Sequence, residues 1–285
     1  MRRLISVLIV LMVSFLLTND AKASEPTWRQ TYSEAIAQEK AGDWDGALQA
    51  AKSALKKADY SFGRKSLNAA KSHVLLGDLD ASRGKYVSAT MHYTNGIAIR
   101  EVLFGVGHPS SAKAWVCLAE LHAGRGKSDQ AVDCFRKAIT HGQNGDQANE
   151  ARALAGLADL QMKRGDAEES VAHLSRAVEI CDFSQKYQKP MCMLALRCHF
   201  NLGEVHMTQR HCLEAANSYK NALSLLESTG NADGFLQHTI LTRLGDAYQQ
   251  AGRNKPADNY HNRALALYNQ LKSPIRVFTG LAAVN

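Results

Sequence analysis

The sequence lacks the motifs by which common classes of enzyme are recognised. It has no glycine loop that could cradle phosphates, no His-Glu-x-x-His pattern, no paired Cys-x-x-Cys elements and no nucleophile elbow. Alternation of apolar and polar residues, which is typical of strands, nowhere runs long enough to predict a sheet. These absences argue against catalysis and indicate an all-α fold, and no cofactor is expected.

Charge of one sign is not concentrated along the chain either. The 34 Lys and Arg residues stand among 27 Asp and Glu residues, for a formal net charge of +7. Because no basic block stands out, we expect no nucleic-acid partner. The apolar run from Leu4 to Leu17 has 14 residues, too few to span a bilayer comfortably.

That apolar run has the flanks of a secretory signal peptide. It follows Met1-Arg2-Arg3 and precedes Ala21-Lys22-Ala23, a small-residue cleavage site. The sequence therefore predicts that residues 1–23 are removed, that the mature protein has no membrane span, and that it is periplasmic or secreted, as in bacteria. Retention of the run as an anchor is the alternative.

The chain carries an internal repeat, which is clearest between Ala112 and Thr140. A turn residue recurs at steps of 42, 42, 39, 45 and 42 residues, and we call it the anchor. The six anchors are Gly42, Gly84, Gly126, Gly165, Arg210 and Gly252. Counted from most anchors, a leucine stands at −8, small residues at −7, +5 and +12, and a large residue at +9.

This pattern predicts a helical hairpin around each anchor. Small residues at −7 and +5, such as Gly203 and Ala215, allow two antiparallel helices to approach closely. The large residue at +9 fills the gap to the next hairpin. A single hairpin cannot bury its apolar face alone, so the hairpins are expected to stack as a solenoid.

The run Leu244-Gly245-Asp246-Ala247-Tyr248, followed by Ala257, resembles the tetratricopeptide signature. The 42-residue period and the segment from Ile97 to Pro109 are similar to the kinesin light chain variety of that repeat. The resemblance implies a right-handed superhelix of about six hairpins over residues 24–272. Residues 273–285 lose the pattern and are expected to cap the last hairpin or to be disordered.

Three rows of residues on the first helices are candidates for a binding groove. Position −13 is basic in five repeats and −6 is acidic in five, and the two lie two turns apart on one helix face. Position −10 is largely apolar and is expected to form hydrophobic pockets between the charges. The candidates are Arg29, Lys71, Lys113, Arg152 and Arg197; Asp78, Glu120, Asp159, Glu204 and Asp246; and Val74, Val116 and Phe200.

The family resemblance implies that such a concave groove binds an extended peptide or a helix. Stacking would place a basic and an acidic ladder side by side, suited to a protein or peptide partner carrying charges of both signs. The alternative is that these charges bridge one another in solvent and maintain solubility. We interpret the chain as an exported adaptor without catalysis. A self-assembling spacer, joined through an imperfectly capped end, is a further alternative.

The six cysteines all follow residue 23, and export would permit disulfides. Cys181 and Cys192 flank one inter-repeat segment and are the first candidate pair; Cys117 and Cys134 are the second. The alternative is that several are small buried hydrophobic residues.

A second alternative to the adaptor is a metal-binding or enzymatic protein that uses a cluster in the fifth repeat. That cluster is Cys198, His199, His206, His211 and Cys212. Imidazole and thiolate are zinc ligands, but the spacing across the hairpin is not that of a zinc motif. The sequence therefore favours core or partly exposed histidines and no metal.

Overall fold

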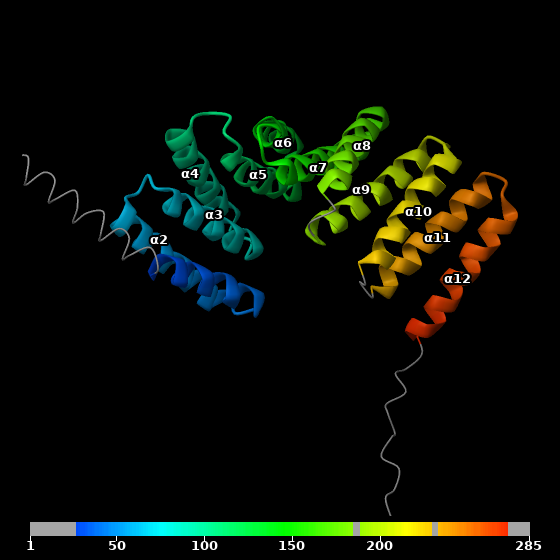
Figure 1. Ribbon diagram of the computed structural model, residues 1–285, viewed down its shortest axis with the longest axis horizontal. Coiled ribbons are helices and arrows are strands. Elements are labelled where there is room, and N and C mark those ends of the chain that lie inside the picture. Colours follow the sequence, from blue (N-terminus) through cyan, green and yellow to red (C-terminus); the bar gives the residue numbers. More distant parts are fainter. Residues whose placement is uncertain (1–26, 185–188, 230–232, 273–285) are drawn as a thin grey trace, which may run out of the picture. The chain divides into compact units, whose positions relative to one another are not determined.

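The computed structural model describes residues 27–184, 189–229 and 233–272 (Figure 1). Every regular element in these ranges is a helix and none is a strand, so the all-α prediction is confirmed. The predicted signal peptide at 1–23 and the tail at 273–285 lie outside the described residues.

The helices follow one another as hairpins. Residues 27–40 are helical, and the elements after them are α2 (Trp44–Phe62), α3 (Leu67–Ser82), α4 (Tyr86–Phe104), the 3₁₀ helix η1 (Pro109–Ser111), α5 (Ala112–Gly124), α6 (Ser128–Gln143), α7 (Gln147–Arg164), α8 (Ala167–Ser184), α9 (Lys189–Thr208), α10 (Cys212–Ser228), α11 (Gly234–Gln250) and α12 (Asn254–Lys272).

The chain forms two compact units that meet in sequence within α7, one ending at Glu150 and the other starting at Ala151. The even spacing of the anchors does not reveal this division. In the first unit α3 packs on α4 and α5 on α6, while α2–α3 and α4–α5 contacts join successive hairpins. In the second unit α9–α10 and α11–α12 form hairpins, and α8–α9 and α10–α11 contacts join them.

All six anchors are turn residues with a left-handed backbone. Their φ angles are 81° at Gly42, 73° at Gly84, 71° at Gly126, 88° at Gly165, 61° at Arg210 and 71° at Gly252. Glycine takes this conformation without the steric cost that a Cβ brings. Arg210 is the one described residue other than glycine with positive φ, which confirms that it replaces glycine at an equivalent turn.

Side-chain caps begin several of these helices. Asp43 accepts a hydrogen bond from the Gly46 amide at the start of α2, and Asp233 accepts one from the Leu236 amide at the start of α11. Ser66 caps α3 in the same way. Such caps satisfy amides that have no partner within the helix, so the boundaries follow from local sequence.

The cores combine small and large side chains in the order that the repeat predicts. In the second unit Tyr219, Ile240, Leu244 and Ala215 are at most 2% exposed and belong to one cluster. In the first unit the first repeat departs from the pattern, with Glu34 in place of the −8 leucine, and it is held by Trp28. Trp28 is 4% exposed and donates from Nε1 to Ser72 Oγ at 3.0 Å. The first hairpin thereby packs on the second although its own pattern is weak.

Candidate partner-binding face

Three of the acidic residues at −6 are held by hydrogen bonds from the second helix of their own hairpin. In three hairpins the side chain at +9 is the partner. Tyr93 donates its hydroxyl to Asp78 Oδ1 at 2.8 Å, and Tyr219 donates to Glu204 Oε1 at 2.7 Å. His261 Nε2 lies 3.1 Å from Asp246 Oδ1. We call Asp78, Glu204 and Asp246 the anchored carboxylates.

A glycine at −7 makes each of these contacts possible. A Cβ added at Gly77 would lie 2.5 Å from Tyr93 Cε1, and one at Gly203 would lie 2.4 Å from Tyr219 Cε1. At Gly245 the corresponding distance to His261 Cδ2 is 2.3 Å. Real Cβ atoms do not approach so closely, so the ring occupies space that only glycine leaves open.

The other hairpins show the converse. Where −7 is alanine, at Ala119 and Ala158, the residue at +9 is Phe135 or Leu174, which carries no hydrogen-bond donor. A small −7 residue was predicted for close helix approach, and the structure confirms it for the three glycines. Its further effect, a ring placed to hold the neighbouring carboxylate, was not predicted. The sequence does contain a signal of this contact, because the repeats with glycine at −7 are those with Tyr or His at +9.

Burial keeps the two phenols protonated. Desolvation raises the pKa of Tyr93 far above its ordinary value, and the charge of Asp78 adds to the effect. Desolvation likewise raises the pKa of Tyr219, with the Glu204 hydrogen bond as the next cause. Both hydroxyls therefore donate at any physiological pH, and both carboxylates accept.

A second set of contacts reaches the −6 carboxylates from the following repeat. Lys113 Nζ lies 3.9 Å from Asp78 Oδ2, and Arg243 Nε lies 3.0 Å from Glu204 Oε1. Asn201 donates from Nδ2 to Asp159 Oδ1 at 2.6 Å. The partners are thus 35, 39 and 42 residues further along the chain. Asn201 and Arg243 were not predicted as site residues, because both stand at −9, outside the three predicted rows.

The basic residues at −13 differ from one another in their contacts and in their exposure. Lys113 makes the ion pair with Asp78. Burial raises the pKa of Asp159, and the charge of Arg197 opposes this effect. Lys71 lies 5.9 Å from the ring centre of Trp28. Arg29 is exposed and Arg152 is partly buried. Glu120, the remaining acidic candidate, is also partly buried.

The apolar row at −10 does not form the predicted pockets. Val74 is 4% exposed and Val116 is fully buried, so neither is accessible to a partner. Phe200 is partly buried and packs on Tyr219 with ring centres 5.6 Å apart. The prediction was wrong because −10 faces the second helix of the same hairpin: a Cβ at Gly96 would lie 3.0 Å from Val74 Cγ2.

The cysteines are all thiols in this structure, and Cys117, Cys134, Cys181 and Cys198 are buried. Burial raises the pKa of Cys181 and of Cys198 to about 12. These thiols are therefore protonated and poorly nucleophilic at neutral pH. The disulfide between Cys181 and Cys192 stays a prediction.

The histidines of the fifth repeat do not converge with its cysteines. Within the described ranges, no three or more His, Cys, Asp and Glu side chains are grouped so that they could hold a metal ion. The rings of His206 and His211 are 6.1 Å apart, and burial lowers the pKa of His206. The metal-binding alternative stays a hypothesis.

None of the helices in the described ranges combines the length and the apolar character needed to cross a bilayer.

Comparison with known proteins agrees with the repeat pattern. Protein KINESIN LIGHT CHAIN-RELATED 3 of Arabidopsis thaliana is 24% identical over 218 residues, which make up 74% of this chain and 32% of that protein. The chain thus spans about a third of the length of this curated relative.

Two solved structures share the fold. The crystal structure of BtubC (BKLC) from P. vanneervenii superposes with a TM-score of 0.66 at 17% identity, covering 90% of this chain and 99% of that one. YrrB, described as a TPR protein with an unusual peptide-binding site, gives a TM-score of 0.52 at 15% identity over 75% of this chain and 92% of its own.

The tetratricopeptide repeat family matches residues 32–90, 110–182 and 193–270. These ranges contain all six anchors and all the anchored carboxylates. Because the match extends over most of the sequence and coincides with the helical hairpins of the structure, the chain belongs to the tetratricopeptide repeat family.

Proposed function

We propose that this protein is an exported adaptor that does no chemistry of its own and that binds a partner protein or peptide, within a unit, along the helix face that carries the −6 carboxylates, which we call the −6 face. The observation that carries the proposal is the rigid placement of the anchored carboxylates. Each is held by a ring from its own hairpin yet keeps part of its surface accessible, with side-chain exposures of 30% at Asp78, 27% at Glu204 and 37% at Asp246.

Rigid placement matters because a partner does not then have to order these side chains on binding. The contacts described for Glu204 use Oε1 alone, and the His261 contact of Asp246 uses Oδ1 alone. The second oxygen of each carboxylate is available to a donor from the partner. Paired oxygens of this kind suit Arg and Lys side chains.

The chemistry expected of the partner is therefore more specific than the sequence suggested. Two of the anchored carboxylates, one in each unit, are already bridged to cations of the next repeat, Lys113 and Arg243. These cations would offer a second contact to carbonyl or carboxylate groups of the partner. An extended segment with basic side chains separated by acidic or polar ones fits both sets of groups.

Membership of a family of helical repeats, together with the similarity to YrrB, whose description includes a peptide-binding site, supports a binding role. Export rests on the pattern at residues 1–23. Its test is mass spectrometry of the protein from its own cells, where the expected mature chain begins at Ser24. Recovery of a chain that still begins at Met1 in the cytoplasm would contradict export without affecting the binding proposal.

The binding proposal is tested by affinity capture with a charge-neutral variant, Glu204→Gln with Asp246→Asn. The amide oxygens can still accept from Tyr219 and His261, so the fold is retained while two charges are lost. At about 1 kcal/mol for each partly exposed ion pair, the affinity for a basic partner should fall roughly tenfold or more.

Glu227→Gln is the control, because Glu227 is exposed, pairs with Arg263 and stands on α10, a second helix, whereas the −6 carboxylates stand on first helices. Circular dichroism establishes that all variants are folded. A partner that the wild type and the control retain and the double variant loses supports the proposal. A partner retained equally by all three excludes the −6 face of the second unit as its site.

A further inference from the structure

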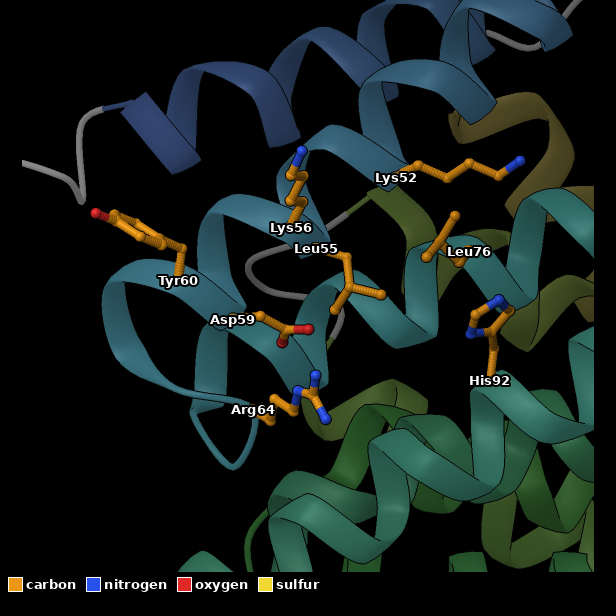
Figure 2. A pocket seen from close by; sticks show the side chains of 8 residues that line it. All are labelled: Lys52, Leu55, Lys56, Asp59, Tyr60, Arg64, Leu76 and His92. Atoms are coloured by element: carbon orange, nitrogen blue, oxygen red, sulfur yellow. The ribbon is translucent and has the colours of Figure 1, made fainter.

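A hollow on the first unit has a different character from the −6 face. It has a volume of about 550 Å³ and is lined mainly by α2 (Figure 2). Its lining residues are Lys52, Leu55, Lys56, Asp59, Tyr60, Arg64, Leu76 and His92. All but Arg64 and Leu76 stand on α2 and α4, the second helices of their hairpins, whereas the −6 carboxylates stand on first helices. We call it the α2 hollow.

Cations dominate the rim of the α2 hollow. Lys52, Lys56 and Arg64 line it, and Asp59 is the one carboxylate in the lining. Within the described residues no ion pair joins any of these three cations to a carboxylate. Like charges held near one another favour the approach of an anion.

The local excess of charge is larger than the composition of the chain suggests. Residues 52–65 contain five cations, Lys52, Lys56, Lys57, Arg64 and Lys65, against one carboxylate, Asp59. Lys57 is turned toward the first helix, where its Nζ lies 2.5 Å from Thr31 Oγ1. The even distribution of charge over the whole chain conceals this segment.

The floor of the hollow is apolar. Leu55 is its accessible part, because it is only partly buried, and it packs against the core cluster that contains Leu76, which is 1% exposed. In Figure 2 these two side chains lie between Lys52 and Lys56 on one side and Arg64 on the other. An apolar floor inside a charged rim suits a ligand with an aliphatic group flanked by opposite charges.

The wall at His92 is neutral at physiological pH. Its Nδ1 lies 3.0 Å from His73 Nδ1, and its Nε2 lies 3.8 Å from Asp80 Oδ2. Burial lowers the pKa of His92, and the nearby Lys52 charge lowers it further, against the opposite effect of Asp80. The positive character of the hollow therefore comes from Lys52, Lys56 and Arg64.

We propose that the α2 hollow is a second docking site, and that it binds an acidic segment of a partner protein through an aliphatic side chain on the Leu55 floor and flanking carboxylates on the basic rim. Charge complementarity selects this occupant. Asp59 opposes a ligand that is anionic throughout, as nucleic acid is, because one anionic group would then meet a carboxylate. The site is separate from the −6 face, which favours basic segments.

The probe is a fluorescein-labelled, end-capped pentapeptide, Glu-Glu-Leu-Glu-Glu. Two control peptides of equal length separate the contribution of charge to binding from that of the aliphatic side chain. Gln-Gln-Leu-Gln-Gln lacks the charge, and Glu-Glu-Ala-Glu-Glu lacks the leucine side chain. Fluorescence anisotropy on the whole chain in about 50 mM salt should show binding of the first peptide with at least tenfold preference over each of the others. About 300 mM salt should weaken that binding through charge screening.

The protein variant reverses two rim charges, Lys52→Glu with Lys56→Glu. The matched control, Lys220→Glu with Lys255→Glu, makes the same change at two exposed lysines of the second unit. We expect the affinity for the acidic peptide to fall tenfold or more in the rim variant and to change less than threefold in the control. The acidic peptide carries four carboxylates, so two reversed contacts are enough for this loss.

Four results would overturn the proposal. One is the absence of acidic-peptide binding up to about 1 mM, and another is an equal loss in the rim and control variants, which indicates nonspecific attraction. The third is equal binding of the leucine and alanine peptides, which removes the floor from the site. The last is rim-dependent binding to phosphatidylglycerol vesicles that exceeds binding to the peptide, which identifies a lipid surface instead. Retained peptide binding by the Glu204→Gln, Asp246→Asn variant separates this site from the −6 face.

Discussion

The coupling between glycine at −7 and the ring at +9 can be tested in the fifth hairpin by Gly203→Ala. A Cβ at this position would lie 2.4 Å from Cε1 and 2.7 Å from Cζ of Tyr219. Tyr219 is fully buried, so its ring cannot move away without disturbing the core of α9, α10 and α11. The ring must shift, and its hydroxyl must then leave Glu204.

Three effects determine the size of the change. Overpacking of a buried site costs about 1–3 kcal/mol. Loss of a hydrogen bond to a charged group costs about 1.5–3 kcal/mol, and the low end applies because Glu204 is partly exposed. Alanine recovers about 1 kcal/mol over glycine in a helix. The net expectation is a loss of about 1.5–3.5 kcal/mol from the free energy of unfolding of this hairpin.

The double variant Gly203→Ala with Tyr219→Leu reproduces the pair found in the fourth hairpin, Ala158 with Leu174. It removes the overlap, so it should be more stable than Gly203→Ala alone, with a coupling free energy of about 1 kcal/mol or more. Native-state hydrogen exchange of α9 and α10 amides measures the local free energy directly.

Ala158→Gly is the control, because it changes the same position next to a leucine. It should cost only about 1 kcal/mol through helix propensity. If Gly203→Ala is neutral, or costs as much in the Tyr219→Leu variant as in the chain that keeps Tyr219, then the ring does not require the glycine and the reasoning fails.

Two further predictions concern the turns and the histidine pair. Arg210→Gly should raise the denaturation midpoint by relieving up to about 1 kcal/mol of left-handed strain, whereas Gly126→Ala should cost about 1 kcal/mol; opposite signs would show that the φ angles do not control these turns. Burial and the neighbouring His92 lower the pKa of His73 to about 4, so its neutral form is favoured on folding, and the stability is complete above about pH 6.5 and falls toward pH 4. Allowing for partial exposure, His73→Gln should reduce this acid loss by about 1–2 kcal/mol in denaturation curves recorded between pH 7 and 4.5, and an unchanged pH slope would contradict it.

The sequence by itself determined the helical hairpins and their turns. Each anchor marks a position where the chain reverses with positive φ, and even Arg210 could be assigned there from the spacing alone. Local rules suffice for this, because a glycine-type turn and periodic apolar residues act within one hairpin. The buried small residues at +5, such as Ala215, follow from the same pattern.

The binding face was only partly predictable. The row of acids at −6 was identified from the sequence, but the residues that contact it, at +9 and in the next repeat, were not. The apolar row at −10 was predicted to line a groove open to a partner, whereas Val74 and Val116 are buried. Helical spacing tells which residues share a face, and it does not tell which neighbour that face meets. Val74 and Val116 are buried because the second helix of their own hairpin covers them.

Tertiary structure alone decided which charges act together. Lys113 meets Asp78 and Arg243 meets Glu204 across successive repeats, at separations in sequence that a single-helix pattern does not relate. The α2 hollow likewise arises where α2, α3 and α4 meet, so that Arg64 and Lys52 flank Leu76. The physical reason is that stacking brings together groups from three helices, and the geometry of that stack depends on side-chain packing rather than on local propensity.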